Sequence, residues 1–287
     1  MTPIELLRRQ EQQLQKYATT TAVRRIRRFY QQARDDLEMR LRRAAKAGSD
    51  FEVQQYQALL RETRAMLKTI AGKMAGELGS SAEETVSASI RQTVRATKTL
   101  ARVYGGVEPR FSLETAAVQL DLVEGVVPSL LKRYHDLGHS SWEAATIHRM
   151  QGVMALGLAE GVSTGEVADR LMDDGFMKER YRAERIARTE AMYSANVARA
   201  VSGREMAHEY PGLKKKLLAV IDDRTHPGCL ALHGTVLEWD EEFVDEDPSH
   251  KVPRRARLPP LHPSCRCSIV PWHDSWGETA FTEPVEE

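Results

Sequence analysis

The chain has 287 residues, of which 41% are hydrophobic, 29% charged and 6% aromatic, and its formal net charge is zero. These values are typical of a globular protein with one large or two ordinary domains, and few aromatic residues favour long helices over a β-sandwich. No apolar run reaches the roughly 18 residues that a membrane span needs, and the first residues lack the pattern of a signal peptide. We therefore expect a soluble protein made in a cytoplasm, without a membrane partner.

The zero net charge hides an asymmetry between the two parts of the chain. Residues 1–110 contain 21 Lys and Arg against 12 Asp and Glu, whereas residues 111–287 contain 20 against 29. Part of the basic excess is a cluster of four arginines, Arg24, Arg25, Arg27 and Arg28. Such a cluster suits an acidic protein partner or the phosphates of DNA, although a basic face exposed to solvent gives the same pattern.

Apolar residues recur at helical spacing over most of the chain. Three long helices are expected in a helical arm or bundle over residues 1–110, with breaks near Gly48, Gly79 and Gly105. A helical region should follow over 111–209. Its expected helices span about 113–124, 128–137, 142–159, 164–173 and 178–209.

The last part of the chain, residues 210–287, has a different pattern. Three short β-prone segments, 217–221, 235–239 and 268–270, predict a small sheet, and an acidic tail follows. An acidic run at 238–247 and a basic run at 251–257 are expected to form a solvated mobile loop. The predicted fold is therefore mainly α, with long N-terminal helices, a helical region and a small C-terminal α+β domain.

All three cysteines of the chain lie in this last part, close to several histidines. His226 and Cys229 are three residues apart, in a segment broken by Pro227 and Gly228, while Cys265 and Cys267 share one face of an extended segment that follows His262. Three thiols and one imidazole are a zinc-ligand set, and the sequence leaves open whether His226 or His262 is the fourth ligand. Small buried thiols or a disulfide are the alternatives.

Four charged residues are candidates for bracing this cluster. Arg188 and Glu190 are two apart on a predicted helix, so they do not share a face and each needs another partner. Asp222 and Arg224 follow a predicted strand, where a turn carboxylate accepts backbone hydrogen bonds and supports the loop that carries His226 and Cys229.

These motifs resemble a known family. The pattern Asp222-x-Arg224-Thr225-x-x-x-Cys229, the segment Pro259-Pro260-Leu-His262-Pro-x-Cys265-Arg-Cys267 and the triplet Arg188-Thr189-Glu190 together resemble the phage head morphogenesis family typified by the Mu F protein. The resemblance covers about residues 140–272. It departs from the family pattern at His226, where family members commonly have a cysteine.

The resemblance implies a minor protein of the virion head, present in few copies near the portal vertex and made in the host cytoplasm. Its implied partners are the portal protein, capsid subunits and the packaged DNA, and its role is in assembly, DNA packaging or DNA delivery rather than catalysis. A nucleic-acid-binding zinc protein is the first alternative. The second is a zinc hydrolase or an ADP-ribosyltransferase-like enzyme built on Arg188 and a glutamate of Glu241-Glu242, although no zinc-protease motif or glycine-rich phosphate loop occurs.

Overall fold

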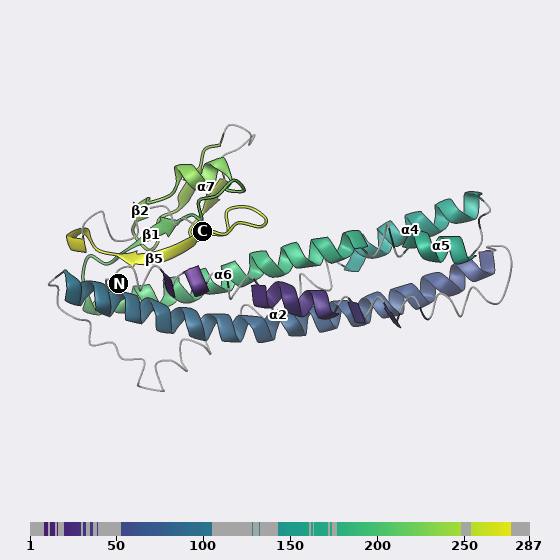
Figure 1. Cartoon of the computed structure of the whole chain (residues 1–287), viewed down its shortest axis with the longest axis horizontal. Coiled ribbons are helices and arrows are strands. Elements are labelled where there is room, and N and C mark those ends of the chain that lie inside the picture. Colours follow the sequence, from purple (N-terminus) through teal and green to yellow (C-terminus); the bar gives the residue numbers. More distant parts are fainter. Residues whose placement is uncertain are drawn as a thin grey trace. The chain divides into compact units, whose positions relative to one another are not determined.

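A computed structural model describes residues 53–104, 143–160, 164–171, 177–247 and 254–276, together with single residues and short stretches between 9 and 39 and at 128, 132, 162 and 173. The chain is mainly α-helical with a small strand region near its C-terminus, as the sequence predicts (Figure 1). In these described residues, no helix is both long and apolar enough to cross a bilayer. The expected helices at 113–124 and 128–137 lie outside the described residues.

The chain divides into two compact units. Unit 1 comprises Met1–Thr21, Ser80–Leu130 and Arg188–Glu287, and unit 2 comprises Ala22–Gly79 and Leu131–Ala187. The longest helices, α2 (Val53–Val103) and α6 (Met177–Glu209), each contribute to both units. The sequence-based division at residues 110 and 209 stays a prediction.

Helix α2 corrects the expected break near Gly79. The helix is 51 residues long in all and continues through Gly79. It does so because the buried side chains Leu78, Ala82 and Val86 form one stripe across this position. A glycine inside a helix costs only about 1 kcal/mol, which packing along such a stripe offsets. The pattern at Ser81–Glu84, which resembles a helix start, therefore lies inside a helix, and the Ser81 side chain is buried.

Unit 2 buries part of the N-terminal basic segment. Residues 20–29 are helical, and the side chains of Ala22, Val23, Ile26 and Phe29 on this segment are buried. Helices α4 (Glu143–Glu160) and α5 (Thr164–Arg170) pack closely in the same unit, since a Cβ on Gly157 would lie 2.6 Å from Val167 Cγ2. The predicted helices at 142–159 and 164–173 are confirmed by α4 and α5.

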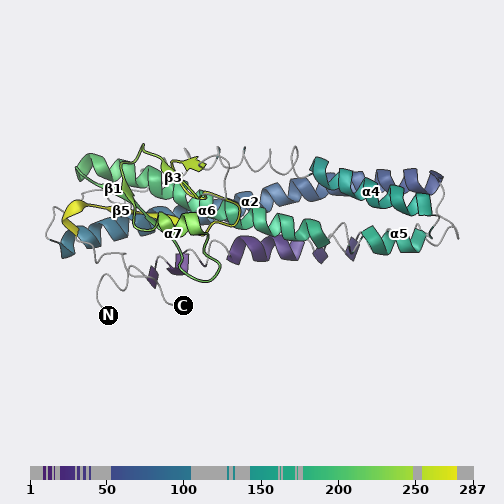
Figure 2. The ribbon, with the colours of Figure 1, turned by 90° about the horizontal axis from the view of Figure 1, so that it is seen from above.

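Unit 1 contains a three-stranded antiparallel sheet of order β2-β1-β5. Its strands are β1 (Lys214–Leu218), β2 (Val236–Leu237) and β5 (Ser268–Trp272), so the expected strand at 217–221 begins earlier. Figures 1 and 2 show this sheet beside α6. Buried residues of both helices and the sheet form one core, represented by Leu100, Met206, Leu217 and Ile269.

The charged insert between β2 and β5 contains two short strands, so the expectation of a solvated loop is wrong for residues 243–245 and 254–256. Strand β3 (Phe243–Asp245) pairs antiparallel with β4 (Arg254–Ala256), and Asp245 lies opposite Arg254. Phe243 and Asp245 are both about 1% exposed. The acidic and basic runs attract each other, and Phe243 anchors the resulting hairpin in the core.

A buried lysine ties the sheet to this insert. The Nζ atom of Lys215 donates to the carbonyl oxygens of Trp239 (3.2 Å), Glu241 (2.6 Å) and Arg257 (2.9 Å). Three N–H donors thus meet three acceptors, which satisfies an ammonium group removed from water. Burial, aided by the nearby charge of Arg204, lowers the pKa of Lys215 to about 8.

Candidate metal centre

Two segments of unit 1 bring the predicted ligand residues together. Cys229 lies on α7 (Pro227–Ala231), a short helix rather than the expected turn, with Pro227 in the first helical turn and His226 as its N-cap. His262, Cys265 and Cys267 lie on the segment that leads into β5. The three cysteines are 1–3% exposed, and their thiols are free.

The side chains of these segments converge on one point. Cys229 Sγ lies 3.0 Å from His262 Nε2 and 3.8 Å from Cys265 Sγ, and the three ligand atoms all lie within 4.8 Å of one another. Cys267 is buried two residues after Cys265, but it is not one of the three residues of this close group. A disulfide needs sulfurs about 2 Å apart, so the Cys229–Cys265 pair is not one. This cluster could bind a metal ion.

The charges of the cluster are strongly coupled. Hydrogen bonds with Cys229 and then Cys265 raise the pKa of His262 to about 10. Hydrogen bonds with Cys229 and Cys267 hold the pKa of Cys265 far below its ordinary value, whereas Cys229, Cys265 and burial raise the pKa of Cys267.

Helix α6 fixes the backbone of the second segment. Asn196 Nδ2 donates to Pro259 O (3.2 Å) and Cys267 O (3.0 Å), and its Oδ1 accepts from Ile269 N at 3.0 Å. Ser264, whose φ of 64° is unusual for a residue other than glycine, donates its N–H to Thr189 Oγ1 at 3.0 Å. Sequence reasoning missed both positions as supports, although Asn196 is a polar residue on an alanine-rich helix and Thr189 lies between Arg188 and Glu190.

Asp222 braces the two segments against each other. Its carboxylate accepts two hydrogen bonds from Arg266, at 2.5 and 2.6 Å, one from Arg224 Nη2 and one from the Arg224 N–H, both at 3.0 Å. The hydrogen bond from Arg266 is the main reason that the pKa of Asp222 lies well below its usual range. The structure therefore brings Asp222 and Arg224 together, while Arg188 is half-buried and Glu190 buried on α6. Their bracing role stays a prediction.

His226 and His233 make contacts of a different kind. His226 Nδ1 accepts a hydrogen bond from Gly228 N at 3.2 Å and lies 3.9 Å from Asp247 Oδ2. The His226 ring also stacks on the His262 ring, with centroids 4.6 Å apart. His233 Nδ1 accepts from Ala219 N at 3.1 Å, so this histidine supports the chain after β1.

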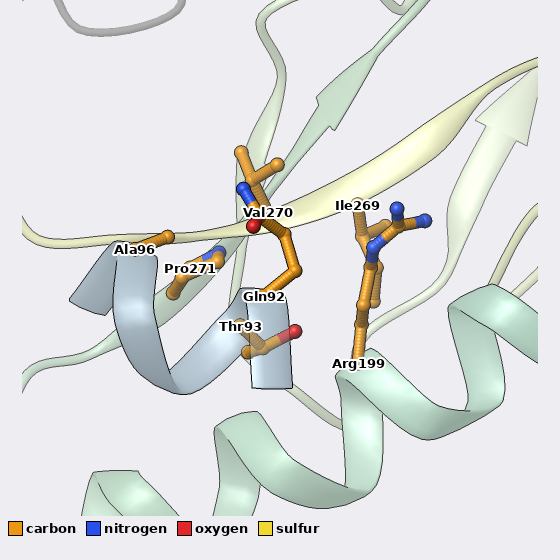
Figure 3. Close-up of a pocket in the computed structure, with 7 residues that line it drawn as sticks. All are labelled: Gln92, Thr93, Ala96, Arg199, Ile269, Val270 and Pro271. Carbon is orange, nitrogen blue, oxygen red and sulfur yellow. The ribbon is translucent and has the colours of Figure 1, made fainter. Parts of the chain in front are cut away.

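A small cavity lies elsewhere in unit 1, between α2, α6 and β5. It has a volume of about 10 Å³, and Figure 3 shows the side chain of Arg199 extending from α6 toward Ile269, with Gln92 and Thr93 contributed by α2. A space of this size holds at most about one water molecule. The cavity is therefore too small for an organic substrate.

The four predicted partner-binding arginines lie in unit 2, and they differ in environment. Arg24 and Arg28 are exposed on the helical segment 20–29. Arg27 is also exposed, but it donates two hydrogen bonds to Glu184, at 3.1 and 3.0 Å. Arg27 is therefore paired within unit 2.

Residues 148–270 match the protein family described as Phage Mu protein F like protein. The resemblance expected from the motifs is confirmed, and the match extends from within α4 to within β5. The whole Cys/His cluster and its supports Thr189, Asn196 and Asp222 therefore lie inside the Mu F-like region.

One curated relative carries the name NAD(+)–arginine ADP-ribosyltransferase EFV and comes from Enterococcus faecalis strain ATCC 700802 / V583. It is 36% identical over 115 residues, which is 40% of this chain. The chain spans only about a quarter of that relative, since the match covers 23% of its length. No solved structure matches the chain.

Proposed function

We propose that this chain is a minor head protein of a phage or phage-like particle, with a structural role in head morphogenesis. The main support is the coincidence of the Mu F-like region with the part of unit 1 that carries the braced Cys/His cluster. The hydrogen bonds of Thr189, Asn196 and Asp222 serve to hold backbone segments together. Such a braced cluster suits a protein that must keep its shape within an assembly.

The proposed partners are the portal protein and capsid subunits, at the portal vertex or inside the head. The test uses the phage or prophage that encodes the chain, with its gene deleted and then restored in a tagged form. We expect the restored protein in purified heads and in complex with the portal, and malformed or DNA-deficient heads after deletion. Normal, infectious heads that lack the protein would refute the proposal.

Contact with packaged DNA is a second candidate function. The observation that favours it is the exposure of Arg24 and Arg28 on one helical segment, two side chains available for phosphate contacts. Sequence-independent retention on DNA that weakens steeply with salt would support it. The same residues would also suit an acidic face of the portal, so binding to both partners must be measured.

We propose that the chain has no catalytic activity of its own. The relative's name describes an ADP-ribosyltransferase, but the match covers less than a quarter of that protein. In this chain, Glu241 accepts a hydrogen bond from Glu238 N, and Lys215 holds the Glu241 carbonyl. Transfer of ADP-ribose from NAD to an arginine substrate, lost on Glu242→Gln, would overturn this part of the proposal.

The metal proposed for the Cys/His cluster is zinc, in a structural role. Buried thiolates and an imidazole are soft ligands that suit zinc, and a site with four protein ligands has no open position for catalysis. Zinc binding would contribute on the order of 10 kcal/mol to the apparent folding free energy. Chelation is therefore expected to unfold the segments around α7 and β5, which circular dichroism and proteolysis would detect.

A further inference from the structure

Two histidines lie beside the three thiols, but a tetrahedral site with three sulfurs needs only one imidazole. The rings of His226 and His262 are stacked, but among the described residues it is His262 that forms the close group with Cys229 and Cys265. The ring nitrogens agree with this, because a nitrogen that accepts a hydrogen bond already uses its lone pair, and a neutral imidazole has only one such nitrogen.

His262 presents the nitrogen that a metal needs. Its Nδ1 lies 2.9 Å from the carbonyl oxygen of Pro263, which accepts and therefore fixes the proton on Nδ1. Nε2 faces Cys229 Sγ at 3.0 Å, so the lone pair that Nε2 exposes when it gives up its proton points toward the sulfurs. A backbone carbonyl that orients a histidine in this way is a common feature of zinc sites.

His226 presents the opposite arrangement. Its Nδ1 accepts the N–H of Gly228 and caps α7, so the proton of the neutral ring lies on Nε2. Coordination through Nε2 would require a proton on Nδ1, and the cap would be lost. Asp247 Oδ2, 3.9 Å from Nδ1, is a further polar neighbour of this nitrogen.

The sulfur positions fit the same site. Zn–S bonds of about 2.3 Å at a tetrahedral angle place two sulfurs about 3.8 Å apart. Cys229 Sγ and Cys265 Sγ are 3.8 Å apart. Cys267 is buried two residues after Cys265 on the same segment, and Asn196 holds its carbonyl oxygen, so a small movement of this side chain would supply the third sulfur.

From this geometry we infer that one metal ion is held by Cys229, His262, Cys265 and Cys267, and that His226 caps α7 without binding the metal. The inference rests on the proposed zinc site and deepens it. His262 then completes the ligand set.

The test measures zinc in the purified full chain, prepared without chelator, by elemental analysis and by competition with a chromophoric chelator. We expect one zinc per chain, a loss of at least about tenfold in affinity for His262→Ala and Cys267→Ser, and a change below about threefold for His226→Asn. Asn is the matched control because its side chain also caps helices.

The possible results distinguish a failure of the ligand assignment from a failure of the proposed zinc site. A wild-type chain without zinc refutes the zinc site itself. Zinc that is lost in His226→Asn but retained in His262→Ala refutes the ligand assignment alone, and so does unchanged affinity in Cys267→Ser. If the alanine or serine variants fail to fold, His262→Cys with cobalt as the probe replaces them. One added Co–S bond must then raise the thiolate charge-transfer absorption at one cobalt per chain, and an unchanged spectrum overturns the assignment.

Discussion

Asn196 Nδ2 donates a hydrogen bond to the carbonyl oxygen of Cys267 at 3.0 Å, which fixes a candidate ligand residue to helix α6. The same side chain serves Pro259 O and Ile269 N. Asn196→Ala would leave these buried backbone groups without their partner, at about 1–3 kcal/mol each. We expect a loss of at least about 3 kcal/mol in the free energy of unfolding, measured by urea denaturation.

Ser202→Ala is the control for this prediction, because its hydroxyl bonds only to carbonyls of its own helix, Ala198 O and Arg199 O. Its cost should stay within about 1 kcal/mol. Equal losses in the two variants would show that the contacts of Asn196 with the loop add nothing.

Alanine substitutions at Gly203, which lies against Trp239, and at Gly76 should change stability in opposite directions. A Cβ on Gly203 would lie 2.1 Å from the Trp239 ring, whose Nε1 donates to Leu213 O, so Gly203→Ala must displace the indole. We expect a destabilisation of about 1–3 kcal/mol. Gly76 on α2 has open space around it, so Gly76→Ala should stabilise the helix by up to about 1 kcal/mol. Thermal unfolding of both variants checks the two signs.

Asp222 should make stability depend on pH. Its pKa is lowered in the folded chain, chiefly by the hydrogen bond from Arg266, so the folded state holds this proton less tightly than the unfolded chain does. The stabilisation is therefore present above the ordinary aspartate pKa of about 3.9 and declines as pH falls below that value. The difference in unfolding free energy between wild type and Asp222→Asn should be constant from pH 7 to 5 and shrink toward pH 3.

The same measurement in an Arg266→Gln background supplies the control for the pH effect. With the Arg266 guanidinium removed, the change in unfolding free energy caused by Asp222→Asn should be smaller at every pH, and its decline below pH 4 weaker. A decline of the same size in both backgrounds would assign the effect to groups other than this pair.

The arginine cluster should separate into two kinds of residue. Arg24→Gln with Arg28→Gln removes exposed charge, and we expect weaker binding to the acidic partner, DNA or portal, with a shallower dependence on salt. Arg27→Gln should instead affect unit 2, where Arg27 pairs with Glu184. Binding at several salt concentrations and thermal unfolding distinguish the two effects. Equal loss of binding in both variants would contradict this division.

The sequence predicted those features that depend on local pattern. The long run of apolar spacing gave α6, and the spacing of Cys265 and Cys267 predicted two inward thiols with Arg266 turned away. It could not choose between His226 and His262, because that choice depends on which nitrogen each ring offers. The break expected at Gly79 was wrong because a buried stripe continues through it.

The hairpin of β3 and β4 escaped prediction for a different reason. Each strand has only three residues, and each lies within a run of charged residues of the kind that is usually exposed to solvent. Their pairing depends on attraction between two runs of opposite sign and on Phe243, a single apolar residue that becomes buried. A pairing between distant segments leaves little signal in either segment alone.

The ammonium of Lys215 binds three carbonyl oxygens as a dissolved cation would, but it is covalently attached to β1. It cannot be removed by a chelator or diluted away. The described region around the sheet therefore has a covalently attached ammonium group that holds Trp239, Glu241 and Arg257, and a candidate site for an exchangeable cation at Cys229 and Cys265. In metal-depleted protein, hydrogen exchange should accelerate around α7 first, while the amides near Lys215 remain protected.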